Sequence, residues 1–265
     1  MRRYLISFAD SRMKKALKRL REQAESVNFF DEIELYTEKD LDENFIEENK
    51  DLLKSRVRGF GYWKWKPYLI NRVLERLNDN DELYYIDAGC HLNPRGRARM
   101  FEYAEMLAES DLGIAAFALG PYCSDKAFTK MDLLVHLGVE NNESILNSGQ
   151  ICATHVFIKK NKRSVEFVQN WLSISNNIHF IDDSPSILTN FPSFVEHRHD
   201  QSVFSILCKL HSATFFSGDE TWPKNNSRDW STMIKFPIWD KRDLGFTTHL
   251  IFRLLRKIKS KIKKK

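Results

Sequence analysis

The chain has 265 residues, of which 42% are hydrophobic and 29% charged, so it can bury the core of one large globular domain. Its net charge of +5 arises at the C-terminal end, because the chain from Leu244 onward holds eight basic residues and no acidic one. The remainder carries 33 Lys and Arg against 36 Asp and Glu. This balance argues against a general nucleic-acid surface, which needs a basic face on the folded domain.

The first elements in chain order are a strand at 4–9, a helix capped by Asp10 or Ser11, and a strand at 32–37. This order implies a right-handed crossover and an α/β fold with a mostly parallel sheet flanked by helices. The same patterns predict further helices at 66–78, 95–109, 128–137 and 161–175, and further strands at 81–87, 111–119 and 149–158.

The N-terminal stretch MRRYLISFAD does not resemble a secretory signal, so we expect a cytoplasmic protein with reduced thiols. The four cysteines show no CxxC spacing, and neither a disulfide framework nor a zinc knuckle is indicated. A zinc site on the adjacent Cys90 and His91 is disfavoured, because adjacent ligands chelate one ion poorly.

Asp87 follows the apolar strand residues YYI and leads into a glycine turn. A carboxylate at the end of a buried strand is costly unless a cation, a hydroxyl or a metal pairs with it. Ligands of open α/β sheets bind beyond the carboxyl ends of strands. Since Asp before Ala-Gly also caps turns, this stretch alone leaves a turn cap and a ligand-binding residue as equal alternatives.

Two other segments have a composition suited to binding. Residues 58–67, RGFGYWKWKP, combine large aromatic rings that can stack on a base or sugar with cations that can hold phosphate; an aromatic corner of the core is the alternative. The NSG turn at 147–149 enters an apolar strand, and HDQ at 199–201 opens a helix. Asp200 suits the N-cap of that helix, a role that needs no catalysis.

In this order, the segments resemble the GT-A-fold glycosyltransferases, in particular small bacterial enzymes that build lipopolysaccharide, capsule or other surface glycans from nucleotide-sugars. The resemblance implies a GT-A-like, Rossmann-like catalytic domain over 1–243. It also implies a transferase of the hexosyltransferase type, with a UDP-sugar as the default donor and a glycan or lipid-linked hydroxyl as the acceptor.

In that family the strand end carries an Asp-x-Asp motif that binds a divalent cation, Mn²⁺ or Mg²⁺, together with the donor. Here the first acid is Asp87 but the second position is Gly89, so a metal would need a further ligand such as His91. In a metal-independent enzyme the cations of residues 58–67 would neutralise the diphosphate. The residues that we assign to the donor site are Asp87, Gly89, Arg58, Trp63, Lys64 and Lys66.

The resemblance also implies that HDQ lies near the reacting centre. In an inverting enzyme Asp200, or as second choice His199, would take the proton of the acceptor hydroxyl. In a retaining enzyme the leaving diphosphate itself often does so, and the sequence leaves the two outcomes open. The residues that we assign to the pocket for the donor sugar and acceptor are Asn147, Ser148, Gly149 and Gln201.

The C-terminal segment 244–265 is expected to form a basic amphipathic helix, since its apolar residues fall on one arc of a helical wheel. It is far too short to span a bilayer, but it suits an anionic membrane surface. We therefore expect peripheral attachment to the inner face of the membrane. A disordered lysine tail and a helix packed on its own domain are the alternatives.

Two other functions remain open at this stage. A sugar-phosphate transferase on a similar scaffold would release a nucleoside monophosphate in place of a diphosphate. A non-catalytic module that binds a glycan or a membrane would account for the missing second acid of the motif.

Overall fold

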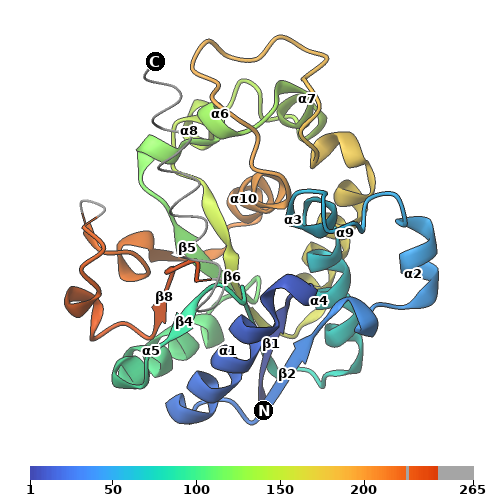
Figure 1. Ribbon diagram of the computed structural model, residues 1–265. Helices are drawn as coiled ribbons and strands as arrows, with labels where there is room; N and C mark the ends of the chain where they lie inside the picture. Colours follow the sequence, from blue (N-terminus) through green and yellow to red (C-terminus); the bar gives the residue numbers. More distant parts are fainter. Residues whose placement is uncertain (225–226, 244–265) are drawn as a thin grey trace, which may run out of the picture.

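Six strands form one sheet in the order β2-β1-β3-β6-β5-β7 in the computed structural model, which describes residues 1–224 and 227–243 (Figure 1). Five strands run in the same direction, and β6 is antiparallel to both of its neighbours, β3 and β5. The sheet is therefore mixed but mostly parallel. Its strands are β1 (Arg3–Phe8), β2 (Glu32–Tyr36), β3 (Glu82–Ile86), β5 (Ile114–Ala118), β6 (Ile151–Lys159) and β7 (Thr214–Ser217).

Helices cover both faces of this sheet. α4, α9 and α10 pack on one face, and α1 and α5 pack on the other (Figure 1). The alternation of side chains along β3 shows the two layers, since Tyr84 faces α1 and α5 while Tyr85 faces α4. The five helices are α1 (Lys14–Val27), α4 (Trp65–Arg76), α5 (Arg97–Ala108), α9 (Lys162–Asn176) and α10 (Asp200–Leu210).

Shorter elements connect these layers. A second, two-stranded sheet pairs β4 with β8 and holds the segment before residue 243 next to the turn that follows β3. The sequence patterns did not predict β4, β7 or β8, which have two to four residues each. The short elements are α2 (Glu43–Glu48), α3 (Gly59–Tyr62), α6 (Asp125–Phe128), α7 (Met131–His136), α8 (Glu143–Leu146), β4 (His91–Leu92) and β8 (Ile238–Trp239).

Three helices begin later than expected, and one of them, α7, begins at Met131 although a helix was expected from 128. Asp10 caps a 3-10 turn, with its side chain accepting a hydrogen bond from the Arg12 backbone, and α1 begins only at Lys14. Asn93 likewise caps a 3-10 turn at Pro94–Gly96, which delays the start of α5. A capping side chain fixes where the backbone turns, but it does not decide whether the first turn is 3-10 or α.

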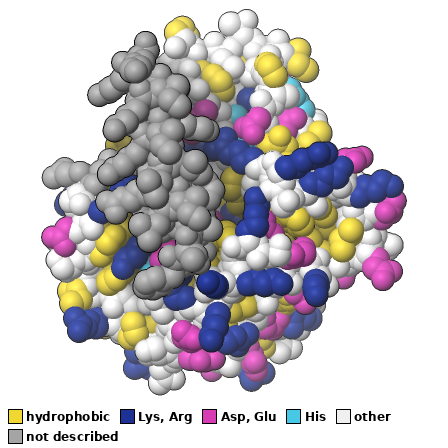
Figure 2. Space-filling view, viewed as in Figure 1, with side chains coloured by type: hydrophobic (Ala, Val, Ile, Leu, Met, Phe, Trp, Pro, Cys, Tyr) yellow, Lys and Arg dark blue, Asp and Glu magenta, His cyan; other side chains and the backbone are white. Residues whose placement is uncertain are grey.

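The expected amphipathic helix at 244–265 lies outside the described residues. Within the part of the chain that is described, no helix has the length and apolar character needed to cross a bilayer. Figure 2 shows that basic and acidic side chains are interspersed over the visible face, so neither sign dominates there.

Candidate functional site

Asp87 lies directly after β3, at the edge of the sheet where β1, β2 and β3 also end. Its backbone N–H donates to the Thr154 carbonyl at 2.9 Å, which fixes the turn against β6. The Tyr85 hydroxyl donates a hydrogen bond to its carboxylate. The Asp87 side chain remains 30% exposed, so it can still accept hydrogen bonds from a ligand.

Lys66 provides the positive charge that the carboxylate requires. Its Nζ lies 3.4 Å from Asp87 Oδ1 and 2.9 Å from Asp200 Oδ2, and it donates to the Ala153 carbonyl at 3.0 Å. The side chain is only 3% exposed. Burial opposes the charged ammonium, but the carboxylates of Asp200 and Asp87 outweigh that effect and raise the pKa of Lys66. A buried, charged lysine therefore joins α4, the end of β3 and the start of α10.

Asp200 is the first residue of α10, and His199 occupies the N-cap position without a capping hydrogen bond from its side chain. The alternative in which Asp200 is the N-cap of this helix is therefore wrong, because its carboxylate turns inward to Lys66. Burial is the main cause that raises the pKa of Asp200 to about 6, and the nearby Asp87 charge adds to it, while Lys66 lowers it. Such a carboxyl group can exchange a proton near neutral pH.

His199 has a strained backbone, with φ 56° and ψ −130°. Its ring is stacked on that of Tyr62 with centroids 5.6 Å apart and lies 5.3 Å from the Trp63 ring. His199 Nε2 lies 3.0 Å from Asp183 Oδ1, and Arg58 reaches the same oxygen at 3.3 Å. Burial lowers the pKa of His199 although Asp183 raises it, so the imidazole is neutral at pH 7.

The turn that carries Trp63 is also unusual, because all five of its residues have positive φ. Gly61, at φ 95°, needs the conformational freedom of glycine, and a Cβ at Gly59 would lie 2.4 Å from the Trp63 ring. Strain of this kind is concentrated at binding and catalytic sites. The residues are Gly59, Phe60, Gly61, Tyr62 and Trp63.

The structure thus brings six predicted site residues into two connected groups. Asp87, Lys66 and Asp200 form one group, and Arg58, Trp63 and His199 form the other. The chain connects them, since Asp200 follows His199 directly. They come from segments that are far apart in the sequence, and α4 packing against the sheet is what places them together.

The other predicted residues have different surroundings. Asn147 and Ser148 bond within their own turn, to the Glu143 side chain and the Ile145 carbonyl. Gly149 packs so closely against the residues that follow β5 that a Cβ there would lie 1.9 Å from the Leu119 carbonyl oxygen.

Gln201 donates to the buried Gln150 side chain at 2.9 Å. Lys64 is half-buried, and burial lowers its pKa. Neither side chain has a hydrogen bond to Asp87 within the described ranges 1–224 and 227–243.

The strand end does not fit a divalent cation held by the protein. Asp87 is the one acid present of the expected Asp-x-Asp motif, and it already contacts a buried ammonium group that would repel a dication. Gly89 supplies no side-chain ligand. His91 is occupied, with Nδ1 3.1 Å from Gln23 and Nε2 3.3 Å from Asp243.

Two residues of the site were not expected from the sequence. Tyr85 reads as an ordinary strand residue, and only its place two positions before Asp87, on the same face of β3, indicates the hydrogen bond. Asp183 lies in a polar loop, FIDDSPS, in which no pattern distinguishes it from its neighbours.

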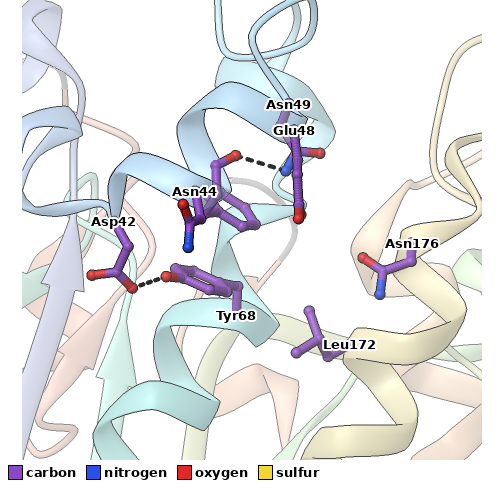
Figure 3. Close-up of a pocket in the computed structure, with 8 residues that line it drawn as sticks. Asp42, Asn44, Glu48, Asn49, Tyr68, Leu172 and Asn176 are labelled. Atoms are coloured by element: carbon purple, nitrogen blue, oxygen red, sulfur yellow. Dashed lines mark hydrogen bonds between the residues drawn. The ribbon is translucent and has the colours of Figure 1, made fainter.

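Two hollows on the surface of the described residues bear on the position of the site. One of about 430 Å³ is lined by residues of α2, α4 and α9 and by Asp42, which precedes α2 (Figure 3), and it contains none of the predicted site residues. The other, of about 500 Å³, includes Asp183 and His197 in its lining. Because Asp183 contacts His199, the second hollow adjoins the candidate site.

No protein-family model matches this chain, and no curated protein matches it by sequence. Among solved structures, it is similar to a glycosyltransferase involved in the glycosylation of the major capsid of PBCV-1, with a TM-score of 0.49 and 11% identity over 90% of this chain and 94% of that one. The TM-score with mouse xyloside xylosyltransferase 1 is 0.47, with 10% identity over 90% and 97% of the two chains.

A third similar structure is the galactosyltransferase LgtC in complex with donor and acceptor sugar analogues, with a TM-score of 0.44 and 12% identity over 89% of this chain and 86% of that one. With TM-scores below 0.5 and identities of 10 to 12%, these likenesses say nothing of the chemistry, which has to be inferred from the side chains. Each of these three structures is a glycosyltransferase, and each likeness covers about 90% of this chain.

Proposed function

We propose that the protein is a glycosyltransferase that moves a hexose from a nucleotide-diphosphate sugar, with UDP as the expected nucleotide, to a hydroxyl of a surface-glycan or lipid-linked acceptor. The observation that carries the proposal is the ion pair between the buried Lys66 and the two acids Asp87 and Asp200. A buried charge network that ends in one exposed carboxylate suits the recognition of sugar hydroxyls at a strand end.

Each group in the network has a proposed role. Asp87 presents its exposed carboxylate to a hydroxyl of the donor. Asp200, with a pKa of about 6, takes the proton of the acceptor hydroxyl as that oxygen attacks the anomeric carbon. Because the Asp200 side chain is only 5% exposed, bound substrates must displace part of what covers it. The neutral His199, held by Asp183, is the second candidate for this proton transfer.

The diphosphate needs positive charge when it leaves. Arg58 is 48% exposed and Lys64 half-buried, so both can contact phosphate oxygens, whereas Lys66 is enclosed between its two acids. We assign neutralisation of the diphosphate to Arg58 and Lys64 and derive no step through a metal ion.

The basic tail supports a further part of the proposal, namely that the enzyme works at the inner face of a membrane. Acyl contact and attraction to anionic lipid add when apolar and basic residues take opposite sides of one segment. The proposed membrane attachment rests on the sequence of residues 249–265.

Thermal stabilisation by a panel of nucleoside diphosphates, with and without manganese, tests the function. A ligand that binds only the folded state raises the Tm by mass action. We expect one nucleotide to raise the Tm without manganese, and Arg58→Ala to reduce that shift. A shift that needs manganese and vanishes in Asp87→Ala would instead establish a metal at the strand end. No shift with any nucleotide, for a folded protein, would favour the non-catalytic module.

A second assay separates the two transferase classes. Release of a nucleoside diphosphate from the bound sugar nucleotide supports the glycosyltransferase. Release of a nucleoside monophosphate would indicate a sugar-phosphate transferase.

A further inference from the structure

A thiol, an imidazole and a carboxylate meet behind the Asp87 turn. Cys90 Sγ lies 3.3 Å from Asp240 Oδ1 and 3.8 Å from His155 Nε2, and the latter two atoms are 2.5 Å apart. In the described part of the chain this is the one set of three Cys, His, Asp or Glu side chains whose ligand atoms all lie within 4.8 Å of one another. Cys90 lies in the turn after β3, His155 in β6, and Asp240 directly after β8.

The cluster is buried. Cys90 is 2% exposed and His155 is fully buried, and the Asp240 side chain is 14% exposed. His155 uses Nε2 for both contacts, and its Nδ1 is buried without a partner among the described residues. A Cys–His–Asp relay for nucleophilic catalysis needs different partners on the two ring nitrogens. The arrangement therefore does not activate the thiol, and all three ligand atoms instead converge on one point.

We propose that Cys90, His155 and Asp240 bind a zinc ion. Thiolate, imidazole and carboxylate are the ligand types that Zn²⁺ takes in proteins, with a fourth position left for water. The proposal goes beyond the transferase function and does not depend on it. It also differs from the disfavoured pairing of Cys90 with His91, because these three ligands come from three separate segments and approach from different directions.

The distances between the three ligand atoms allow zinc binding if one of them lengthens. Tetrahedral zinc with ordinary bond lengths places its ligand atoms about 3.4 to 3.6 Å apart. The two distances from Cys90 Sγ, 3.3 and 3.8 Å, lie near that range. The His155–Asp240 pair is closer by roughly 1 Å, so zinc binding would exchange one hydrogen bond for two coordinate bonds.

The charge of the three ligands and the hydrogen bond that orients Asp240 also suit a dication. One thiolate and one carboxylate neutralise Zn²⁺, and a site with zero net charge avoids the cost of an uncompensated buried charge. The Thr221 hydroxyl donates to Asp240 Oδ2 at 3.0 Å and so orients the carboxylate with Oδ1 toward the cluster. Binding would release the Cys90 proton to solvent.

The position of the ion gives it a structural role. The Cys90 N–H donates to the Asp87 carbonyl at 2.9 Å, so a ligand bond at Cys90 would hold the turn that carries Asp87. The same ion would attach the end of β8 to the central sheet. We expect zinc to stabilise the fold without contacting the substrate.

The full-length protein can be equilibrated with zinc chloride, desalted and analysed for bound metal. We expect about one zinc per chain, and a content lower by roughly tenfold or more in Cys90→Ser. Cys152→Ser, which removes a buried thiol outside the set of three, should keep its zinc. Cobalt substitution should give thiolate-to-metal charge-transfer absorption in the wild type and in Cys152→Ser but not in Cys90→Ser.

Zinc that persists in Cys90→Ser, zinc that is lost in Cys152→Ser, or a wild type with no bound metal would each overturn the assignment. Melting curves recorded with and without a chelator distinguish a zinc site from a simple buried hydrogen bond between His155 and Asp240. If the His155–Asp240 contact were only a hydrogen bond, Asp240→Asn would lower the Tm, and the chelator would leave the wild-type Tm unchanged. For a zinc site, the chelator lowers the wild-type Tm and leaves that of Cys90→Ser unchanged.

Discussion

Lys66 and Asp200 form an ion pair of 2.9 Å in which the side chains are only 3% and 5% exposed. They lie in different helices, α4 and α10, and Asp87 completes the group from the end of β3. Removing one partner of a buried ion pair leaves an uncompensated charge, which costs more than the pair itself contributes.

Lys66→Met should lower the free energy of unfolding by about 3 to 5 kcal/mol, because Asp87 and Asp200 would then face each other without a cation. Lys64→Met, two residues earlier and only half-buried, should change it by less than about 1 kcal/mol. Urea denaturation of the two variants measures both effects. Equal losses would show that Lys66 is not the charge that holds the group together.

Asp200 should impose a pH dependence on turnover. Since its pKa is raised to about 6, the carboxylate is protonated below that pH and cannot accept the acceptor proton. We expect the rate to fall as the pH drops through about 6, and Asp200→Asn to reduce turnover by roughly 10²- to 10⁴-fold. A pH–rate profile, with circular dichroism to verify folding, is the measurement. Normal turnover in a folded Asp200→Asn would remove the assignment.

The same group predicts a change in stability with pH. A carboxyl whose pKa is higher in the folded state than its ordinary value of about 3.9 favours folding in its protonated form. Its contribution is complete below that ordinary value and is lost as the pH rises to about 6. Asp200→Asn should lack this loss between about pH 4 and 6, which unfolding curves at several pH values can detect.

The strain at His199 is testable with two substitutions. Both His199→Gly and His199→Ala lose the imidazole and its contact with Asp183, but only glycine adopts φ 56° and ψ −130° without steric cost. The glycine variant should therefore be more stable than the alanine variant by about 1 kcal/mol. Thermal or urea unfolding of the pair measures the difference, and an alanine variant of equal or greater stability would contradict it.

Two glycines should respond differently to a methyl group. In Gly149→Ala the new Cβ would lie 1.9 Å from the Leu119 carbonyl oxygen, so a backbone segment must move. In Gly89→Ala the Cβ meets the Arg242 backbone at 3.5 Å, an ordinary contact. We expect a loss of at least about 2 kcal/mol for the first and less than about 1 kcal/mol for the second, measured by urea unfolding. A large loss in Gly89→Ala would show that the turn beside Asp87 is tighter than the contacts indicate.

Membrane attachment is tested by truncation after Gly245. The full chain should sediment with anionic vesicles, and the binding should weaken at high salt, because part of it is charge attraction. The truncated chain should remain in the supernatant, and neutral vesicles serve as the control. Equal binding of both chains would place any membrane contact elsewhere in the molecule.

The sequence by itself determined the features that depend on neighbours along the chain. The apolar periods located β1, α1, β2, α4, β3, α5, β5, β6 and α9 to within a few residues, because side-chain spacing follows local backbone geometry. The pattern of a buried strand before Asp87 also placed that carboxylate at a strand end. Elements of two to four residues, such as β4 and β8, were missed, since so short a segment carries no period.

The tertiary structure alone decided which distant residues meet. The reversed direction of β6 depends on the path of the intervening chain, and it brings His155 opposite Ile86 of β3. Lys66 could be assigned to phosphate binding by its neighbours in the sequence, yet packing of α4 on the sheet encloses it between two acids. The cluster of Cys90, His155 and Asp240 likewise has no local signature, because its members are separated by 65 and 85 residues and only folding makes them neighbours.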